Sequence, residues 1–177
     1  LVKAGYLVRH QGKGTFISRS RKDKLVRLSD NEVFSNKQEE DTVKVLKLQE
    51  EKQSEILKKL GLPKYDSYYY IERLRLIGDT PFMVHRSFIP AKFINRNLAK
   101  DPNNYHSIYE TLQSDKQLYL FDEPFTETDT IVKADSEISK QLKIAKDYPV
   151  VRQVKKTILS TTGEVVELVI GYKRCDY

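Results

Sequence analysis

The chain has 177 residues, 39% of them hydrophobic and 32% charged, a length that accommodates one well-buried domain and a small additional segment. No apolar run approaches the roughly 20 residues that cross a bilayer, which excludes a membrane-spanning protein. The net charge of +6 is concentrated at the start: residues 1–27 carry eight basic side chains against one acidic, and the other 150 residues carry 23 against 24. A polyanionic partner is therefore expected to meet the first segment, not the larger domain.

The first predicted element is a β-hairpin, formed by the β-prone runs at residues 6–9 and 14–17 around a turn that contains glycine. Residues 18–30, SRSRKDKLVRLSD, have the low apolar content of a charged linker. The hairpin could be a plain edge ribbon or a wing that touches nucleic acid, and the pooled positive charge favours the wing. The wing side chains expected near phosphates are Arg9, His10 and Lys13.

The larger domain is predicted to alternate β-hairpins with short helices, because runs of period-two hydrophobicity are separated by helical spacings and turn residues. Such a pattern predicts an α+β fold: an antiparallel sheet with short helices against one face. Strands are expected at residues 42–48, 68–77, 82–89, 118–133, 150–160 and 164–173, and helices at residues 50–60, from 107 onward and at 135–144.

The strand at residues 68–77 presents two arginines on one face. Because side chains alternate along a strand, Arg73 and Arg75 lie about 7 Å apart, beside apolar neighbours. Each guanidinium can offer a planar fork to a phosphate or carboxylate, and a bound anion would relieve their mutual repulsion. The alternative is that both arginines pair with acids of the sheet such as Glu167, and the spacing alone leaves both readings open.

The remaining chemical signatures are absent from the sequence. The three histidines are far apart without metal-ligand spacing, and neither a GxSxG nor a GxGxxG motif occurs, so no metal and no cofactor is expected. The single cysteine, Cys175, cannot form an internal disulfide, and no secretory signal precedes it. Both features favour a reducing cytoplasm.

Two parts of the sequence resemble a known family. The run LVKAGYLVRHQGKGTFI resembles the end of the winged helix-turn-helix of GntR-type bacterial transcription regulators, and the remainder resembles the UTRA effector-binding domain of their HutC branch, which shares the chorismate lyase fold. The motifs that carry the second resemblance are IERLR at 71–75, Thr80-Pro81, RSFIP at 86–90, SIY at 107–109, YPVV at 148–151 and the run from Gly163 to Tyr177.

The resemblance implies three parts: residues 1–18 as a wing, 19–30 as a linker, and 31–177 as the effector-binding and dimerisation domain. It implies a homodimeric regulator, expected to be a repressor, whose binding to operator DNA is released or altered by a small anionic metabolite, foremost a sugar phosphate. Against the family pattern the sequence looks cut at both ends, so weak and unspecific DNA binding is expected of this polypeptide.

The resemblance also implies the effector contacts. Arg73 and Arg75 would face the effector, Ser107 and Tyr109 would hold its phosphate, Glu167 would meet sugar hydroxyls, and Ser29 to Asn31 would add a hydroxyl. His85 stands where many members have a glutamate, so the identity of their effectors cannot be transferred to this chain. The competing hypothesis is a chorismate-lyase-like enzyme that binds a small carboxylate substrate with the same arginines; the basic wing argues against it.

Overall fold

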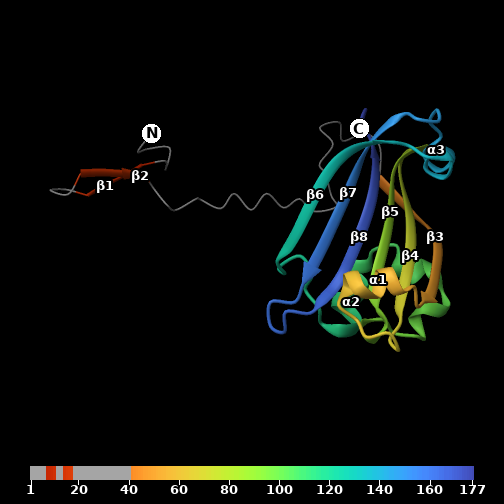
Figure 1. The fold of residues 1–177 in the computed structure, drawn as a ribbon, viewed down its shortest axis with the longest axis horizontal. Coiled ribbons are helices and arrows are strands. Elements are labelled where there is room, and N and C mark those ends of the chain that lie inside the picture. Colours follow the sequence, from red (N-terminus) through yellow and green to blue (C-terminus); the bar gives the residue numbers. More distant parts are fainter. Residues whose placement is uncertain (1–6, 11–13, 18–40) are drawn as a thin grey trace. The chain divides into compact units, whose positions relative to one another are not determined.

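The computed structural model describes residues 7–10, 14–17 and 41–177. The chain divides into two units, Leu1–Ser35 and Asn36–Tyr177, and each is considered by itself. In the first unit two short antiparallel strands pair with each other, which agrees with the two strands predicted for the hairpin (Figure 1). These strands are β1 (Leu7–His10) and β2 (Gly14–Ile17).

The second unit is built on a six-stranded sheet, which is antiparallel as the sequence predicted. The strand order, which the sequence did not predict, is β3-β4-β5-β8-β7-β6 (Figure 1). Two hairpins, β4–β5 and β7–β8, meet along β5 and β8, so segments far apart in the sequence lie side by side at the centre. The strands are β3 (Asp41–Glu51), β4 (Tyr68–Ile77), β5 (Thr80–Pro90), β6 (Phe125–Lys133), β7 (Pro149–Ile158) and β8 (Val165–Arg174).

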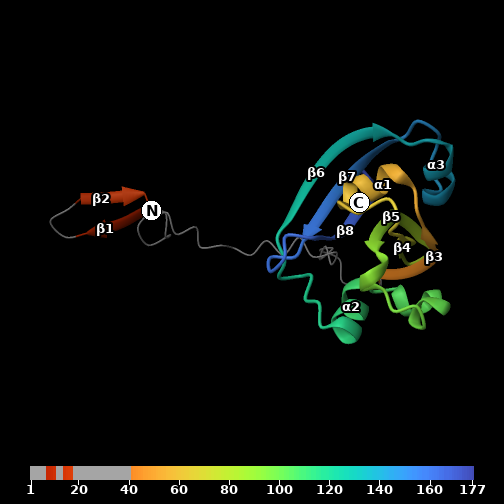
Figure 2. The same ribbon diagram turned by 60° about the horizontal axis from the view of Figure 1, so that its bottom comes forward.

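Helices cover both faces of the sheet, whereas the sequence predicted them on one (Figure 2). We call the face under α2 and three short 3-10 helices the α2 face, and the opposite one the α1 face. Both faces of β4 carry buried side chains, so each needs a cover. The helices are α1 (Ser54–Leu60), α2 (Ile108–Lys116), α3 (Ser136–Leu142) and the 3-10 helices Ala91–Phe93, Leu98–Lys100 and Pro102–Tyr105.

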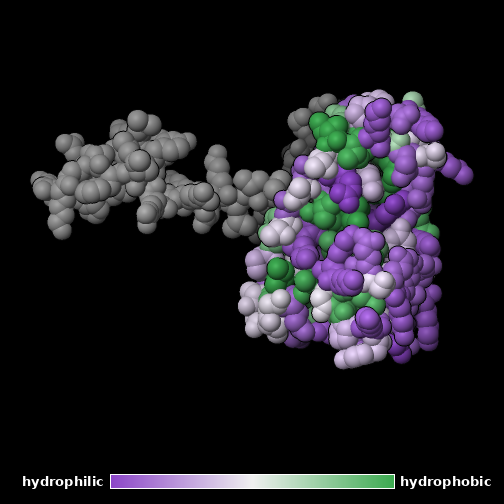
Figure 3. Space-filling view, in the orientation of Figure 1, coloured by the Kyte–Doolittle hydropathy of each residue, from purple (hydrophilic) through white to green (hydrophobic). Residues whose placement is uncertain are grey.

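On the α1 face, α1 buries Ile56, Leu57 and Leu60, as their helical spacing predicted. The helix begins at Ser54, later than expected, because β3 continues to Glu51. In the space-filling view, polar side chains (purple) are interrupted by apolar patches (green) on this side of the unit (Figure 3). None of the helices in the described ranges is long and apolar enough to cross a membrane.

The predicted strand at residues 118–133 is wrong in its first part, since β6 begins only at Phe125. Gln117 adopts a left-handed conformation and ends α2, and the amide of Leu118 then donates to the carbonyl of Leu112. Leu120 is 3% exposed and packs in the core of the α2 face. Leu118 and Leu120 therefore anchor a loop between α2 and the sheet.

Candidate anion-binding site

Arg73 joins the sheet to the first turn of α2. Its side chain is on the α2 face of β4 and the residue is 7% exposed. The guanidinium Nη1 donates to the backbone oxygen of His106 at 3.2 Å, and His106 directly precedes Ser107, the N-cap of α2. The contact holds a buried cation at the beginning of a helix 33 residues further along the chain.

The start of α2 supplies further donors beside this cation. Ser107 is partly buried and extended, and its side chain makes no capping hydrogen bond in the described part of the chain. The first N–H groups of a helix have no intrahelical acceptor, and they carry the positive end of the helix dipole. Guanidinium, hydroxyl and amide donors thus gather at one point, a combination suited to phosphate or carboxylate oxygens.

Arg75 is buried on the same strand but has a different environment. Its Nη2 forms an ion pair with the carboxylate of Asp41 on β3, and its guanidinium lies 5.3 Å from the ring centroid of Phe82. The reading in which the arginines pair with acids of the sheet thus describes Arg75, with Asp41 as the acid and not Glu167. Asp41 compensates one of the two cationic charges on this strand.

His85 lies directly beside Arg73, because the two residues are cross-strand partners on β5 and β4. It is 4% exposed, and Gly171 of β8 is its partner on the other side. A Cβ atom on Gly171 would lie 3.2 Å from Cδ2 of His85 and 3.1 Å from Cε of Met83. The missing side chain at this position therefore lets the imidazole lie closely against β8.

Tyr109 and Glu167 form a second polar group on the α2 face. The phenol Oη of Tyr109, in the first turn of α2, donates to Glu167 Oε2 on β8 at 3.0 Å. Lys155 Nζ on β7 donates to the same phenol oxygen at 3.1 Å, and it lies 4.6 Å from the ring centroid of Phe125. Glu167 is 1% exposed, so its carboxylate is held in a buried chain of hydrogen bonds.

Sequence reasoning missed Lys155. Alternation along the predicted strand at 150–160 does put Lys155 and Thr157 on one face, but nothing in the sequence states which residues of β8 they oppose. The register provides that information, because Thr157 is the cross-strand partner of Glu167.

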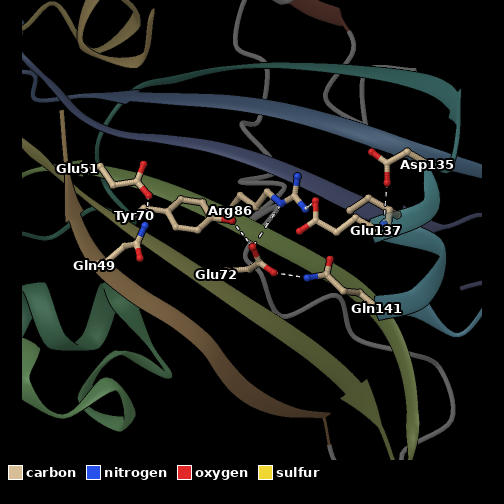
Figure 4. Close-up of polar contacts among 9 residues, drawn as sticks. Gln49, Glu51, Tyr70, Glu72, Arg86, Asp135, Glu137 and Gln141 are labelled. Carbon is tan, nitrogen blue, oxygen red and sulfur yellow. Dashed lines mark hydrogen bonds and ion pairs between the residues drawn. The ribbon is translucent and has the colours of Figure 1, made fainter. Parts of the chain in front are cut away.

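A separate polar cluster lies on the α1 face (Figure 4). Two of its members, Glu72 and Arg86, are the cross-strand pair next to Arg73 and His85, so their side chains point to the opposite face. Glu72, 5% exposed, accepts hydrogen bonds from Tyr70 Oη on β4 and Gln141 Nε2 on α3. Arg86 Nε is 3.6 Å from Glu72 Oε2, and Arg86 Nη2 is 3.0 Å from Glu137 Oε2. Burial, and then the hydrogen bond to Glu72, raise the pKa of Tyr70. The cluster fastens α3 to the same two strands that carry Arg73 and His85.

The structure brings the predicted site residues together only in part. Arg73 contacts the residue before Ser107 at the start of α2, and His85 is its cross-strand partner. Tyr109 donates to Glu167 on the same face, whereas Arg75 is paired with Asp41. Their roles toward an effector stay predictions. Arg9 and His10 belong to β1, whose side chains are not described, and Lys13, Ser29, Asn31 and the predicted linker at 19–30 lie outside the described residues.

Comparison with known proteins gives a family match over most of the chain. Residues 38–177 match the UTRA domain family. The ligand-binding domain of a candidate GntR-family transcriptional regulator from Bordetella bronchiseptica superposes with a TM-score of 0.70 at 15% identity, over 82% of this chain and 89% of that chain. The C-terminal domain of the histidine utilization repressor from Pseudomonas syringae pv. tomato gives 0.66 at 18% identity, over 77% and 93%. Among curated proteins none is similar enough in sequence to match.

Proposed function

The chain belongs to the UTRA domain family, and from this premise we propose that its larger unit binds a small anionic metabolite on the α2 face and so regulates transcription. The names of the similar structures support the regulatory part, since they include a GntR-family ligand-binding domain and a repressor. The observation that carries the chemical part is the contact of the buried Arg73 with the backbone at the beginning of α2.

A sugar phosphate is the effector class that we propose. The phosphate would lie at Arg73 and the first turn of α2, where a guanidinium, the Ser107 hydroxyl and backbone amides offer donors. The hydroxyls of the sugar would extend toward Glu167 and toward Tyr109, which we assign to this end, and not to the phosphate as the resemblance implied, because its phenol donates to Glu167. Because α2 contacts both groups, an effector bridging them would hold α2 against the sheet.

The proposed regulatory function also assigns a role to the smaller unit, which is DNA binding. β1 and β2 would be the wing of a winged helix-turn-helix head of the HutC type, and the protein would act as a cytoplasmic homodimeric repressor that leaves its operator when the effector binds. Effector and operator affinities would then be coupled through the larger unit, with reciprocal effects of each ligand on the other.

The direct test is a thermal-shift titration with a panel of hexose phosphates and inorganic phosphate. A ligand at 100 times its dissociation constant stabilises the folded state by about 2.7 kcal/mol, which raises the Tm by roughly 8 °C for a domain of this size. We expect Arg73→Met to abolish the shift. The matched control is Arg96→Met, because the Arg96 side chain is 77% exposed and lies 3.8 Å from Glu50.

Two results would contradict the proposal. The first is a shift that is as large in Arg73→Met as in the unmodified protein. The second is release of pyruvate from chorismate, which would instead support the enzyme that the sequence left as the competing hypothesis.

A further inference from the structure

The side chains around Glu167 differ in chemistry from those around Arg73. Tyr109 gives its single hydroxyl hydrogen to Glu167 Oε2, so its oxygen is left to accept from Lys155. A lysine ammonium has three hydrogens, and one of them is used in this contact. A carboxylate has two oxygens that can each accept more than one hydrogen bond. The region therefore combines a pure donor, Lys155, with a pure acceptor, Glu167.

Thr157 adds a hydroxyl to this pair. It is the cross-strand partner of Glu167, lies two residues from Lys155 on the same face of β7, and is 1% exposed. Its Oγ1 has no hydrogen-bond partner among the described residues. A buried hydroxyl that is left without a partner costs free energy, so a polar group that reaches it gains affinity.

We infer that Lys155 and Thr157 complete, with Glu167, a subsite that reads the hydroxyl groups of the effector; this inference rests on the proposed function. A sugar hydroxyl donates one hydrogen and accepts others, so it can donate to Glu167 and accept from Lys155 at the same time. A carboxylate at this position could only accept, and it would meet the negative charge of Glu167.

The two ends of the site, one at Glu167 and the other at Arg73, also differ in net charge. Lys155 and Glu167 carry opposite charges and both contact the phenol oxygen of Tyr109, so their end suits a neutral polar group. At the other end Arg73 adds its charge to the positive end of the α2 dipole, while Asp41 compensates Arg75. The effector that matches both ends carries one phosphate and a neutral, hydroxyl-bearing body, and is not a phosphorylated sugar acid.

The test compares three kinds of probe by isothermal titration calorimetry at constant ionic strength. They are inorganic phosphate, the hexose 6-phosphates of glucose, mannose and fructose, and 6-phosphogluconate, which bears a carboxylate at the end opposite the phosphate. We expect the best hexose phosphate to bind at least tenfold more tightly than inorganic phosphate and more tightly than 6-phosphogluconate.

The variants isolate the subsite. Lys155→Met should weaken binding of the best hexose phosphate about tenfold or more, the range expected for loss of a hydrogen bond to a charged group. The affinity for inorganic phosphate should stay within about twofold of that of the unmodified protein. Thr157→Val keeps the shape without the hydroxyl, so it should weaken the hexose phosphate several-fold without lowering the Tm. Lys156→Met is the control, because Lys156 is the next residue of β7 and faces the α1 side.

The possible failures are distinguishable. The subsite is overturned if hexose phosphates bind no better than inorganic phosphate, or if Lys155→Met and Thr157→Val bind them as tightly as the unmodified protein does. In that case an Arg73-dependent response to phosphate would still support the proposed function. If neither phosphate nor any hexose phosphate binds to the folded protein, the proposed function fails and the subsite fails with it.

Discussion

The polar cluster on the α1 face allows a quantitative prediction for Arg86→Met. Methionine keeps much of the aliphatic volume and removes the guanidinium, so Glu72 loses the cation 3.6 Å from its carboxylate. Breaking a buried ion pair by removing one partner costs about 3–5 kcal/mol. Because Glu72 keeps hydrogen bonds from Tyr70 and Gln141, and the Arg86 side chain is 17% exposed, we expect about 3 kcal/mol, at the low end.

The assay is urea unfolding followed by circular dichroism. With a slope of about 2 kcal/mol per molar urea, the midpoint should fall by about 1.5 M. Glu137→Gln should cost at most about 1 kcal/mol, since that side chain is 63% exposed. Arg96→Met is the control, because its side chain is 77% exposed, and it should stay within about 0.5 kcal/mol.

A loss of less than about 1 kcal/mol of unfolding free energy in Arg86→Met, or a loss no larger than that of the control, would contradict this role of Arg86. The double variant Glu72→Gln with Arg86→Met supplies a second check. It should be more stable than Arg86→Met alone, because no uncompensated charge is left buried.

Two further predictions concern a helix cap and a buried tyrosine. Asp135 accepts a hydrogen bond from the Ile138 amide at 2.8 Å, so Asp135→Ala should cost about 1 kcal/mol in urea unfolding, and Asp135→Asn much less. Burial, and then the hydrogen bond to Glu51, raise the pKa of Tyr68 from 10.0 to about 12. Its stabilising contribution is thus complete below pH 10 and is lost as pH rises toward 12, so Tyr68→Phe should show a shallower fall of unfolding free energy over that interval, and an equal fall would contradict the assignment.

Local signals in the sequence predicted most of the sheet. The strand at 68–77 has the predicted bounds, because tyrosines and alternating apolar residues end at a glycine-containing turn that fixes the hairpin. The helix at 135–144 was also predicted close to its bounds, through its acidic cap. These signals act within a few residues, so they can be read without knowledge of the fold.

The parts that sequence reasoning missed depend on contacts between distant segments. The sequence of the loop before β6 has the pattern of a strand. It is a loop because Leu120 packs in the core of the α2 face, a contact that the sequence does not indicate. Asp41 as the partner of Arg75, and Lys155 as the partner of Tyr109, follow from strand register and helix placement. Helices on both faces likewise reflect packing between hairpins that no local pattern specifies.

Binding of an anion where Arg73 meets the first turn of α2 can be observed directly by NMR. Amide and guanidinium chemical shifts would be followed while the best-binding hexose phosphate is added. We expect the largest changes at the amides of residues 108–110 and at the Arg73 side chain, and we expect Arg73→Met to remove them. Saturable binding whose shift changes are confined to α1 and α3, with residues 107–110 unmoved, would contradict binding at this place.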